Sequence, residues 1–284
     1  MSIVNLSDLL KPAALQGYAV AAFNIVNYQT TQAVILAAEK INSPLILQTS
    51  VSTVKAIGAK PLITFVRDLA ESARVPVAIH LDHCTDYDLV LKCADLGWSS
   101  VMIDLSSQPY EENKDKTAQV VTYCHARGVS VEGELGAIMG VEDDLFVSQH
   151  DAALADPDLS VDYCQATGID AFAPAIGTAH GLYKGVPKVE FELLRTIANR
   201  VSCPVVVHGG TGLSDDAFRQ CIRQGAAKIN ISTALKIAYC QGLSSYLQKK
   251  PEENNPLKVD AAAMEDVMAM ATRHMILFGS EGKA

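Results

Sequence analysis

The sequence predicts a (β/α)8 barrel with a C-terminal helical extension, formed as a single domain of residues 1–284. Short apolar, β-branched runs recur at fairly even intervals, segments with helical periodicity lie between most of them, and three runs open with proline (Pro44, Pro76 and Pro204). Alternating strands and helices form parallel strands with right-handed crossovers, and eight such units can close into a barrel. A doubly wound open sheet is the alternative, but the GxGxxG signature of dinucleotide-binding sheets does not follow the first strand.

The expected strands run along most of the chain. They comprise residues 18–24, 44–50, 76–82, 100–106, 129–135, 170–177, 204–210 and 226–232. Between the first two, residues 32–41 place their apolar side chains on one helical stripe. The connection from Gly136 to about Ser160 is too long for an ordinary loop, and such a loop in a compact domain is usually functional or disordered. A last helical run is expected at residues 261–276.

Composition narrows the function classes. Apolar residues make up 49% of the chain and charged residues 19%, which is ordinary for a globular protein. The net charge of −9 leaves no basic patch, so neither nucleic acid nor a membrane is an expected partner. The seven cysteines include no CxxC pair and indicate reduced thiols. The chain opens without signal-peptide features and has no apolar run near the ~20 residues that span a bilayer, so we expect a cytoplasmic protein.

Polar and titratable residues gather where the expected strands end, which in a barrel is the catalytic rim. These residues are Asn24, Ser50, Asp82, His83, Asp104, Glu132, Glu134, His180, His208, Asn230, Ser232 and Thr233. Neutral imidazoles from three separate strands, here His83, His180 and His208, with one open position, are typical of a catalytic zinc site. His80 shares a face with Asp82 and is interpreted as a supporting or core residue.

The other histidines are interpreted as structural or solvated. They are His125, His150 and His274.

Glycine-rich turns give a second signal. Small residues in GTAHG (177–181) and HGGTG (208–212) allow backbone amides to approach a ligand, and Asn230, Ser232 and Thr233 lead directly into an expected helix. Amides at a helix start bind phosphate well, and barrels often place such a site after strands 7 and 8. The pattern therefore predicts a phosphate site beside the metal.

Eight segments of the chain resemble one enzyme family in their order and their residues. They are AFN (22–24), HLDH (80–83), VMID (101–104), VEGELG (131–136), GVEDD (140–144), AIGTAHG (175–181), VVHGGTGL (206–213) and KINISTALK (228–236). Together they resemble the class II, zinc-dependent ketose-bisphosphate aldolases, and most of all the shorter group that includes tagatose-bisphosphate aldolase. The resemblance extends along nearly the whole chain.

This resemblance implies an assignment for each site residue. His83, His180 and His208 would hold zinc, Asp82 would be the catalytic acid/base, and the mobile-loop residue Glu142 would take part in proton transfer. Glu134, together with Asp104, would belong to a secondary metal position. The substrate-binding residues would be Gly181, Gly209, Gly210, Thr211, Asn230, Ser232 and Thr233, with Asn24 and Ser50.

The same resemblance implies the reaction and the partners. The substrate would be a ketose 1,6-bisphosphate of the tagatose or fructose type, cleaved to dihydroxyacetone phosphate and an aldehyde such as glyceraldehyde 3-phosphate. A monovalent cation, Na+ or K+, would lie near the phosphate, and a homodimer or homotetramer is expected.

One departure from the family affects the substrate. Relatives carry D-P-R near the C-terminus, whose arginine grips the far phosphate of a neighbouring subunit's substrate, whereas this chain has Leu257 followed by Lys258. Either another base such as Lys258, Lys184 or Lys55 replaces the arginine, or the natural substrate is a ketose 1-phosphate.

Three other functions compete with this interpretation. A Schiff-base aldolase needs a desolvated lysine on a barrel strand, but Lys228 lies toward the beginning of its strand. A metal-dependent hydrolase would not need the phosphate-type turns. A non-catalytic sugar-phosphate binding protein would keep the turns but would not need Asp82.

Overall fold

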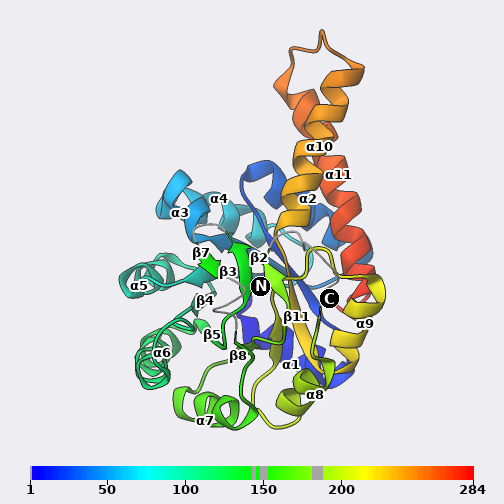
Figure 1. Ribbon diagram of the computed structural model, residues 1–284. Coiled ribbons are helices and arrows are strands. Elements are labelled where there is room, and N and C mark those ends of the chain that lie inside the picture. The colour runs from blue at the N-terminus through cyan, green and yellow to red at the C-terminus, as the bar shows by residue number, and fades with distance from the viewer. Residues whose placement is uncertain (1, 143–144, 148–152, 181–187) are drawn as a thin grey trace.

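The computed structural model describes residues 2–142, 145–147, 153–180 and 188–284. Eight parallel strands form a closed barrel in the order β1-β11-β10-β8-β5-β4-β3-β2 (Figure 1). The strands are β1 (Val20–Asn24), β2 (Leu45–Ser50), β3 (Val77–Cys84), β4 (Ser100–Ile103), β5 (Ser130–Leu135), β8 (Ala171–Pro174), β10 (Val205–Val207) and β11 (Ala226–Ile231). This confirms the predicted (β/α)8 fold. Several strands end earlier than expected, so Asp104 and His208 lie just beyond β4 and β10.

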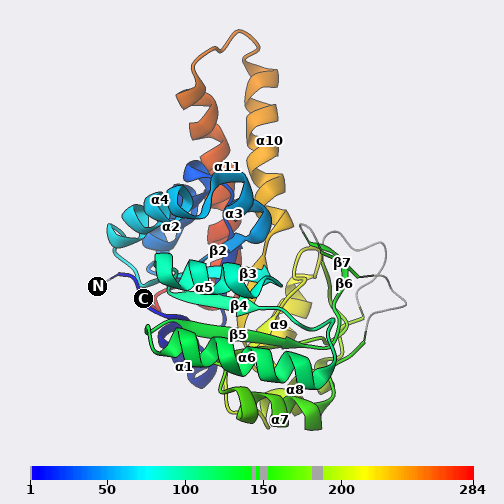
Figure 2. The ribbon, with the colours of Figure 1, turned by 90° about the vertical axis from the view of Figure 1, so that its left-hand side faces the viewer.

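Helices surround the barrel on the outside (Figures 1 and 2). They are α1 (Leu6–Gln16), α2 (Tyr28–Ile41), α3 (Val51–Ile57), α4 (Ala59–Glu71), α5 (Tyr87–Leu96), α6 (Tyr110–His125), α7 (Pro157–Thr167), α8 (Phe191–Ala198), α9 (Asp215–Arg223), α10 (Thr233–Lys249) and α11 (Pro256–Leu277). The helices α10 and α11 pair as a hairpin whose tip projects away from the barrel (Figure 2). In the described part of the chain, no helix combines the length and the apolar composition needed to cross a bilayer.

The amino end of the barrel is closed by α1. Leu6, Leu9 and Leu10 of this helix are buried against the inward-facing residues of the strands, which are small or β-branched at this level, such as Ala78 and Val206. Apolar side chains therefore fill most of the lower part of the barrel, and its ionisable residues lie in the middle and at the carboxyl rim.

The long connection after β5 contains secondary structure. Strand β6 (Met139–Glu142) pairs antiparallel with β7 (Leu145–Val147) and parallel with β9 (Ala179–His180). The connection ends at Pro157, the first residue of α7, because the Asp156 side chain accepts hydrogen bonds from two amides of the first turn. The connection is therefore as long as expected to within a few residues of Ser160, and it contains β6 and β7.

The last helix starts earlier than the apolar periodicity indicated. The Asn255 side chain accepts a hydrogen bond from the Leu257 amide, and Pro256 has the backbone angle that suits a first helical position. Both signals lie in the sequence, but they precede the first residue of the apolar stripe.

Gly136, which begins the long connection, is packed tightly against Ala153 and Ala175, and a substitution can test this packing. Its φ of 83° is left-handed, and an added Cβ would lie 2.6 Å from both the Ala153 carbonyl oxygen and the Ala175 Cβ. Gly17, with a φ of 72°, has open space around the same position. We expect Gly17→Ala to cost about 1–2 kcal/mol of unfolding free energy through its backbone angle alone. Gly136→Ala should cost about 1–3 kcal/mol more, because overpacking is added. Urea denaturation of both variants measures the difference, and equal losses would contradict this account.

Candidate active site

Two adjacent residues at the end of β3, Asp82 and His83, both contribute to the same cluster. Strict alternation along a strand would send neighbouring side chains to opposite faces. Here the pairing of β3 with β4 shifts register between Leu81 and Cys84, and His83 has a φ of 45°, in the left-handed region. The bulge turns His83 toward the barrel mouth, where it joins Asp82 and His208. One ligand atom from each of these three lies within 4.8 Å of the others.

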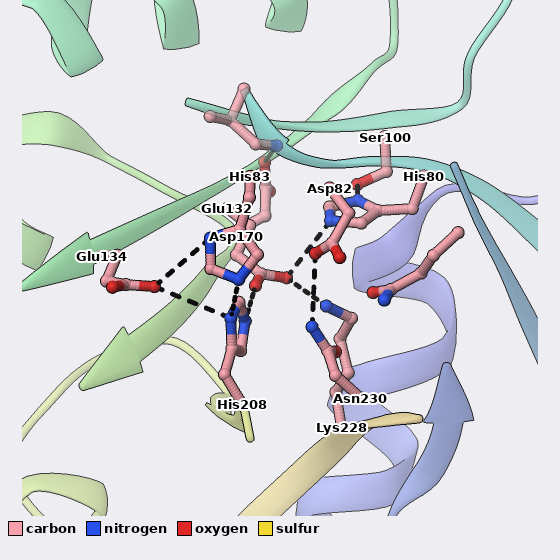
Figure 3. A network of polar contacts seen from close by, with 12 residues as sticks. His80, Asp82, His83, Ser100, Glu132, Glu134, Asp170, His208, Lys228 and Asn230 are labelled. Atoms are coloured by element: carbon pink, nitrogen blue, oxygen red, sulfur yellow. Dashed lines mark hydrogen bonds and ion pairs between the residues drawn. The ribbon is translucent and has the colours of Figure 1, made fainter. Parts of the chain in front are cut away.

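The two described imidazoles of the cluster face each other. Nε2 of His83 lies 2.7 Å from Nδ1 of His208 (Figure 3). The other nitrogen of each ring contacts a carboxylate: His83 Nδ1 lies 2.8 Å from Asp104, and His208 Nε2 lies 2.7 Å from Glu132. Ionised carboxylates only accept hydrogen bonds, so each ring donates to its carboxylate and turns a lone pair toward the other ring. At this distance the two nitrogens either share one proton or offer their lone pairs to one cation beside them, as in a metal site.

The ionisable groups around the cluster also favour a bound cation. Burial opposes ionisation of Asp104, but hydrogen bonds from His83 and Ser106 outweigh it and hold the pKa of that carboxyl well below its usual range. Burial lowers the pKa of His208, and the neighbouring His83 lowers it further, so His208 is neutral, the form that binds metals. Burial, Asp104 and Glu132 together raise the pKa of Glu134 well above its ordinary value.

Glu134 is the residue that a metal ion would satisfy. Its Oε2 is buried without a hydrogen-bond partner among the described residues, 3.6 Å from His208 Nδ1 and 3.9 Å from His83 Nδ1. Glu134 also forms a second possible metal-binding group with His83 and Asp104. The structure thus brings together Asp104 and Glu134, the two residues predicted for a secondary metal position, and their donor atoms fit a divalent cation.

Asp82 is held by two amide side chains. Asn24 Nδ2 donates to its Oδ2 at 2.7 Å. Asn230 Nδ2 donates to its Oδ1 at 3.2 Å (Figure 3). Asn24 is itself fixed by Gln48, whose Nε2 donates to the Asn24 side-chain carbonyl oxygen at 2.9 Å. Both carboxylate oxygens therefore have a fixed direction beside the imidazole pair. Asn24 and Asn230, which were predicted as substrate contacts, therefore both lie beside Asp82 at the carboxyl rim.

The glycine turns bring two loops into backbone contact. Gly209 has a φ of 69°, and a Cβ added there would lie 2.5 Å from the Ala179 carbonyl oxygen. Gly210 lies similarly close to the Asn230 carbonyl oxygen. The turn after His208 therefore lies against β9, which contains His180, and against the end of β11. The side chains of His180 and Glu142, and Gly181 as a whole, lie outside the described residues.

The remaining predicted substrate contacts lie at helix starts. Ser50 accepts a hydrogen bond from the Thr53 amide and caps α3. Ser232 precedes α10, which begins at Thr233, and its side chain makes no capping hydrogen bond. Thr211 lies in the turn before Ser214, whose side chain caps α9.

One polar layer lies below the rim, and sequence reasoning recognised it only in part, because it placed Glu132 at the rim and His80 in a supporting or core position. Lys228, which the sequence places toward the beginning of its strand, is fully buried in the barrel and donates to Glu132 Oε2 at 2.9 Å. His80 lies at the same level, with its Nδ1 2.8 Å from the Ser100 hydroxyl. The spacing in the sequence could have revealed this layer. Each of its residues comes two positions before a rim residue and so points to the same face of its strand: His80 before Asp82, Glu132 before Glu134, and Lys228 before Asn230.

The histidines outside the cluster have structural contacts. His125 Nε2 lies 2.7 Å from Asp170, and His274 Nδ1 contacts the Met270 carbonyl oxygen. His150 lies outside the described residues.

A barrel whose carboxyl rim holds paired imidazoles, acidic residues and glycine turns defines a metal-dependent barrel enzyme. Residues 4–283 match the family Fructose-bisphosphate aldolase class-II, and the chain belongs to this family. It is therefore a class II aldolase, a carbon–carbon lyase of a zinc-dependent family that acts on sugar phosphates.

Individual relatives are similar to this chain over nearly its full length. The chain is 41% identical to the fructose-bisphosphate aldolase of Geobacillus stearothermophilus over 287 residues, covering 100% of this chain and 99% of that protein. The crystal structure of the YdjI aldolase from Escherichia coli K12 is similar with a TM-score of 0.87 and 31% identity, covering 99% of each chain. The fold is also that of fructose-bisphosphate aldolase from Campylobacter jejuni, with a TM-score of 0.85, 23% identity and coverage of 100% and 97%.

The facing imidazoles predict a measurable response to metal. We expect zinc added to metal-free protein to raise the melting temperature, by the equivalent of about 2.7 kcal/mol at a free concentration 100 times the Kd. His208→Ala should abolish most of this increase, because it removes one of the two facing nitrogens. His125→Ala is the matched control, since His125 also faces a carboxylate but lies at the end of α6. Equal zinc responses in the two variants would show that the metal binds elsewhere.

Proposed function

We propose that this aldolase cleaves a ketose 1,6-bisphosphate of the fructose or tagatose type to dihydroxyacetone phosphate and an aldehyde such as glyceraldehyde 3-phosphate. The observation that carries the proposal is the carboxylate of Asp82, fixed by Asn24 and Asn230 beside the facing imidazoles of His83 and His208. The relative that is 41% identical is a fructose-bisphosphate aldolase, which supports the substrate class.

Zinc, held by His83, His180 and His208, would supply Lewis-acid stabilisation of the negative charge that develops as the carbon–carbon bond breaks. Asp82 takes the proton from the C4 hydroxyl, the C4–O bond becomes a carbonyl, and the electron pair of the C3–C4 bond passes to the ketose fragment. A proton then returns to C3, and Glu142 is proposed for this step. The amide groups of Asn24 and Asn230 keep the accepting oxygens of Asp82 in place during the transfer.

The phosphate shared by all candidate substrates is proposed to bind at the turns after β9, β10 and β11. The proposed contacts are Gly181, Gly209, Gly210, Thr211, Asn230, Ser232 and Thr233, with a monovalent cation nearby. The close backbone approach at Gly209 and the start of α10 directly after Ser232 support this placement, since small residues and helix N-termini favour anion binding.

A Schiff-base mechanism is disfavoured by the surroundings of Lys228. Its amino group is fully buried and forms an ion pair with the Glu132 carboxylate at 2.9 Å, below the rim where a substrate carbonyl would bind, so it is not placed as a nucleophile.

A ketose 1-phosphate is the second candidate substrate, and the tip of the α10–α11 hairpin favours it. Leu257 is 77% exposed there, and the neighbouring Lys258 forms an ion pair with Glu253 at 3.2 Å. The tip projects away from the barrel of its own chain (Figure 2), so these residues could reach a substrate only in another subunit. The projecting hairpin, with Leu247 and Leu257 exposed, supports the proposed homodimer or homotetramer.

Replacing the proposed base tests the reaction. Asp82→Asn keeps the size of the side chain but removes the proton acceptor, so kcat should fall by about 10²–10⁴-fold. Zinc content, measured by atomic absorption, should stay near that of the wild type, because Asp82 is not one of the proposed ligands. The cleavage assay is run with and without chelator. Loss of zinc in the variant would identify Asp82 as a metal ligand, and full activity after exhaustive chelation would contradict the zinc mechanism.

The far phosphate can be tested at Leu257. We compare kcat/KM for a ketose 1,6-bisphosphate and the matching 1-phosphate, in wild type and Leu257→Arg. A charge-assisted phosphate contact is worth about 1.5–3 kcal/mol, or about 10- to 150-fold in kcat/KM. We expect the variant to increase the preference for the bisphosphate within this range. Leu257→Gln is the uncharged control. A strong wild-type preference that Leu257→Arg leaves unchanged would show that the far phosphate already has a site elsewhere.

A further inference from the structure

A buried chain of three side chains lies behind the metal cluster. Lys228 Nζ donates to Glu132 Oε2 at 2.9 Å, and Glu132 Oε1 lies 2.7 Å from His208 Nε2 (Figure 3). The side chains of all three are inaccessible to solvent. On its opposite side, His208 presents Nδ1 to His83 and Glu134.

Hydrogen-bond chemistry makes this chain directional. The ammonium group of Lys228 can only donate, so it occupies one oxygen of Glu132 as an acceptor. The other carboxylate oxygen is also an acceptor and therefore requires a proton on His208 Nε2. A neutral imidazole carries one such proton, so the lone pair of His208 is placed on Nδ1.

We propose that Lys228 and Glu132 are positioning residues, which fix the tautomer and the ring orientation of His208 so that Nδ1 is the atom offered to the metal. This rests on the proposed role of His208 as a zinc ligand. Carboxylates that accept a proton from a metal-binding histidine are a general means of orienting the ligand. Here Lys228 extends the arrangement by one group, because its hydrogen bond to Oε2 aligns the Glu132 carboxylate inside the barrel and leaves Oε1 to accept from His208.

The alternative is that the ion pair only fills the barrel interior. Buried ion pairs are weak evidence for stability, because desolvation offsets their attraction. Removing both charged groups would then bring no specific recovery of metal binding. His80 is the third group near Glu132, but its Nε2 lies 3.6 Å from Oε2, longer than a hydrogen bond.

Glu132→Gln separates these explanations. The ammonium group of Lys228 must retain an acceptor, so the glutamine oxygen faces Lys228 and the glutamine NH2 group faces His208. That NH2 donates to Nε2, which moves the proton of His208 to Nδ1 and blocks the metal-binding atom. We expect zinc affinity to fall by about 10- to 100-fold, measured by competition with a chromophoric chelator on the full-length chain. The absorption bands of the cobalt-loaded protein should change as well.

A second substitution should reverse the first. In Glu132→Gln with Lys228→Met, the glutamine oxygen is released and can accept from His208 again, while its NH2 group can turn toward His80 Nε2. We expect this double variant to recover most of the lost zinc affinity. A structural role predicts instead that the double variant binds zinc as weakly as Glu132→Gln or more weakly. That result, or unchanged affinity in Glu132→Gln, would overturn the proposal.

Two controls show whether a loss of zinc affinity is specific to the chain from Lys228 to His208. Asp170→Asn removes a carboxylate that also faces a histidine at 2.7 Å, His125, and should leave zinc affinity unchanged. Circular dichroism and thermal melting of the metal-free proteins show whether each variant is folded, and recovery in the double variant excludes global damage as the cause. If the wild type binds no zinc, the proposed function fails. If the wild type binds zinc and Glu132→Gln binds it equally well, only the positioning role fails.

Discussion

Burying several carboxylates at the mouth of a barrel is costly unless positive charge accompanies them, and this constraint governs the site. Asp82, Asp104, Glu132 and Glu134 are all buried there. Lys228 compensates Glu132, and the donors from His83 and Ser106 stabilise Asp104. The raised pKa of Glu134 and the facing imidazoles show where the compensation is incomplete without a cation. The same buried carboxylates therefore both favour metal binding and make the rim depend on a cation for charge compensation.

The bulge in β3 is the backbone feature that makes this arrangement possible. A regular strand would point His80 and Asp82 into the barrel and His83 away from it. The register shift and the left-handed φ of His83 allow a proton-accepting group and a metal ligand to be consecutive in sequence and adjacent in space. A left-handed angle at a residue other than glycine costs about 1–2 kcal/mol, which the surrounding barrel must supply.

The sequence predicted the barrel and most of the cluster for the same reason. Short apolar, β-branched runs identify buried strands, and parallel strands bring their carboxyl ends together, so Asp82, His83 and His208 could be grouped by their positions at strand ends. The bulge itself could not be predicted, because no residue type in HLDH requires it. The early start of α11 was missed because the Asn255 cap lies before the apolar stripe. The pairing within the long connection depends on β9, which is distant in sequence.

The ion pair between Glu132 and Lys228 could not be predicted from the sequence either. Each residue, considered alone on its strand, is a charged side chain at a position that a barrel normally fills with apolar groups. Their compensation becomes visible only when β5 and β11 are placed around the same interior. The barrel interior then consists of layers: apolar residues above α1, next Lys228, Glu132 and His80, and then the rim residues two positions further along each strand. His208 connects the two upper layers, because its Nε2 contacts Glu132 in the middle layer and its Nδ1 faces His83 at the rim. In this fold the interior between the apolar floor and the rim is therefore part of the active site's construction.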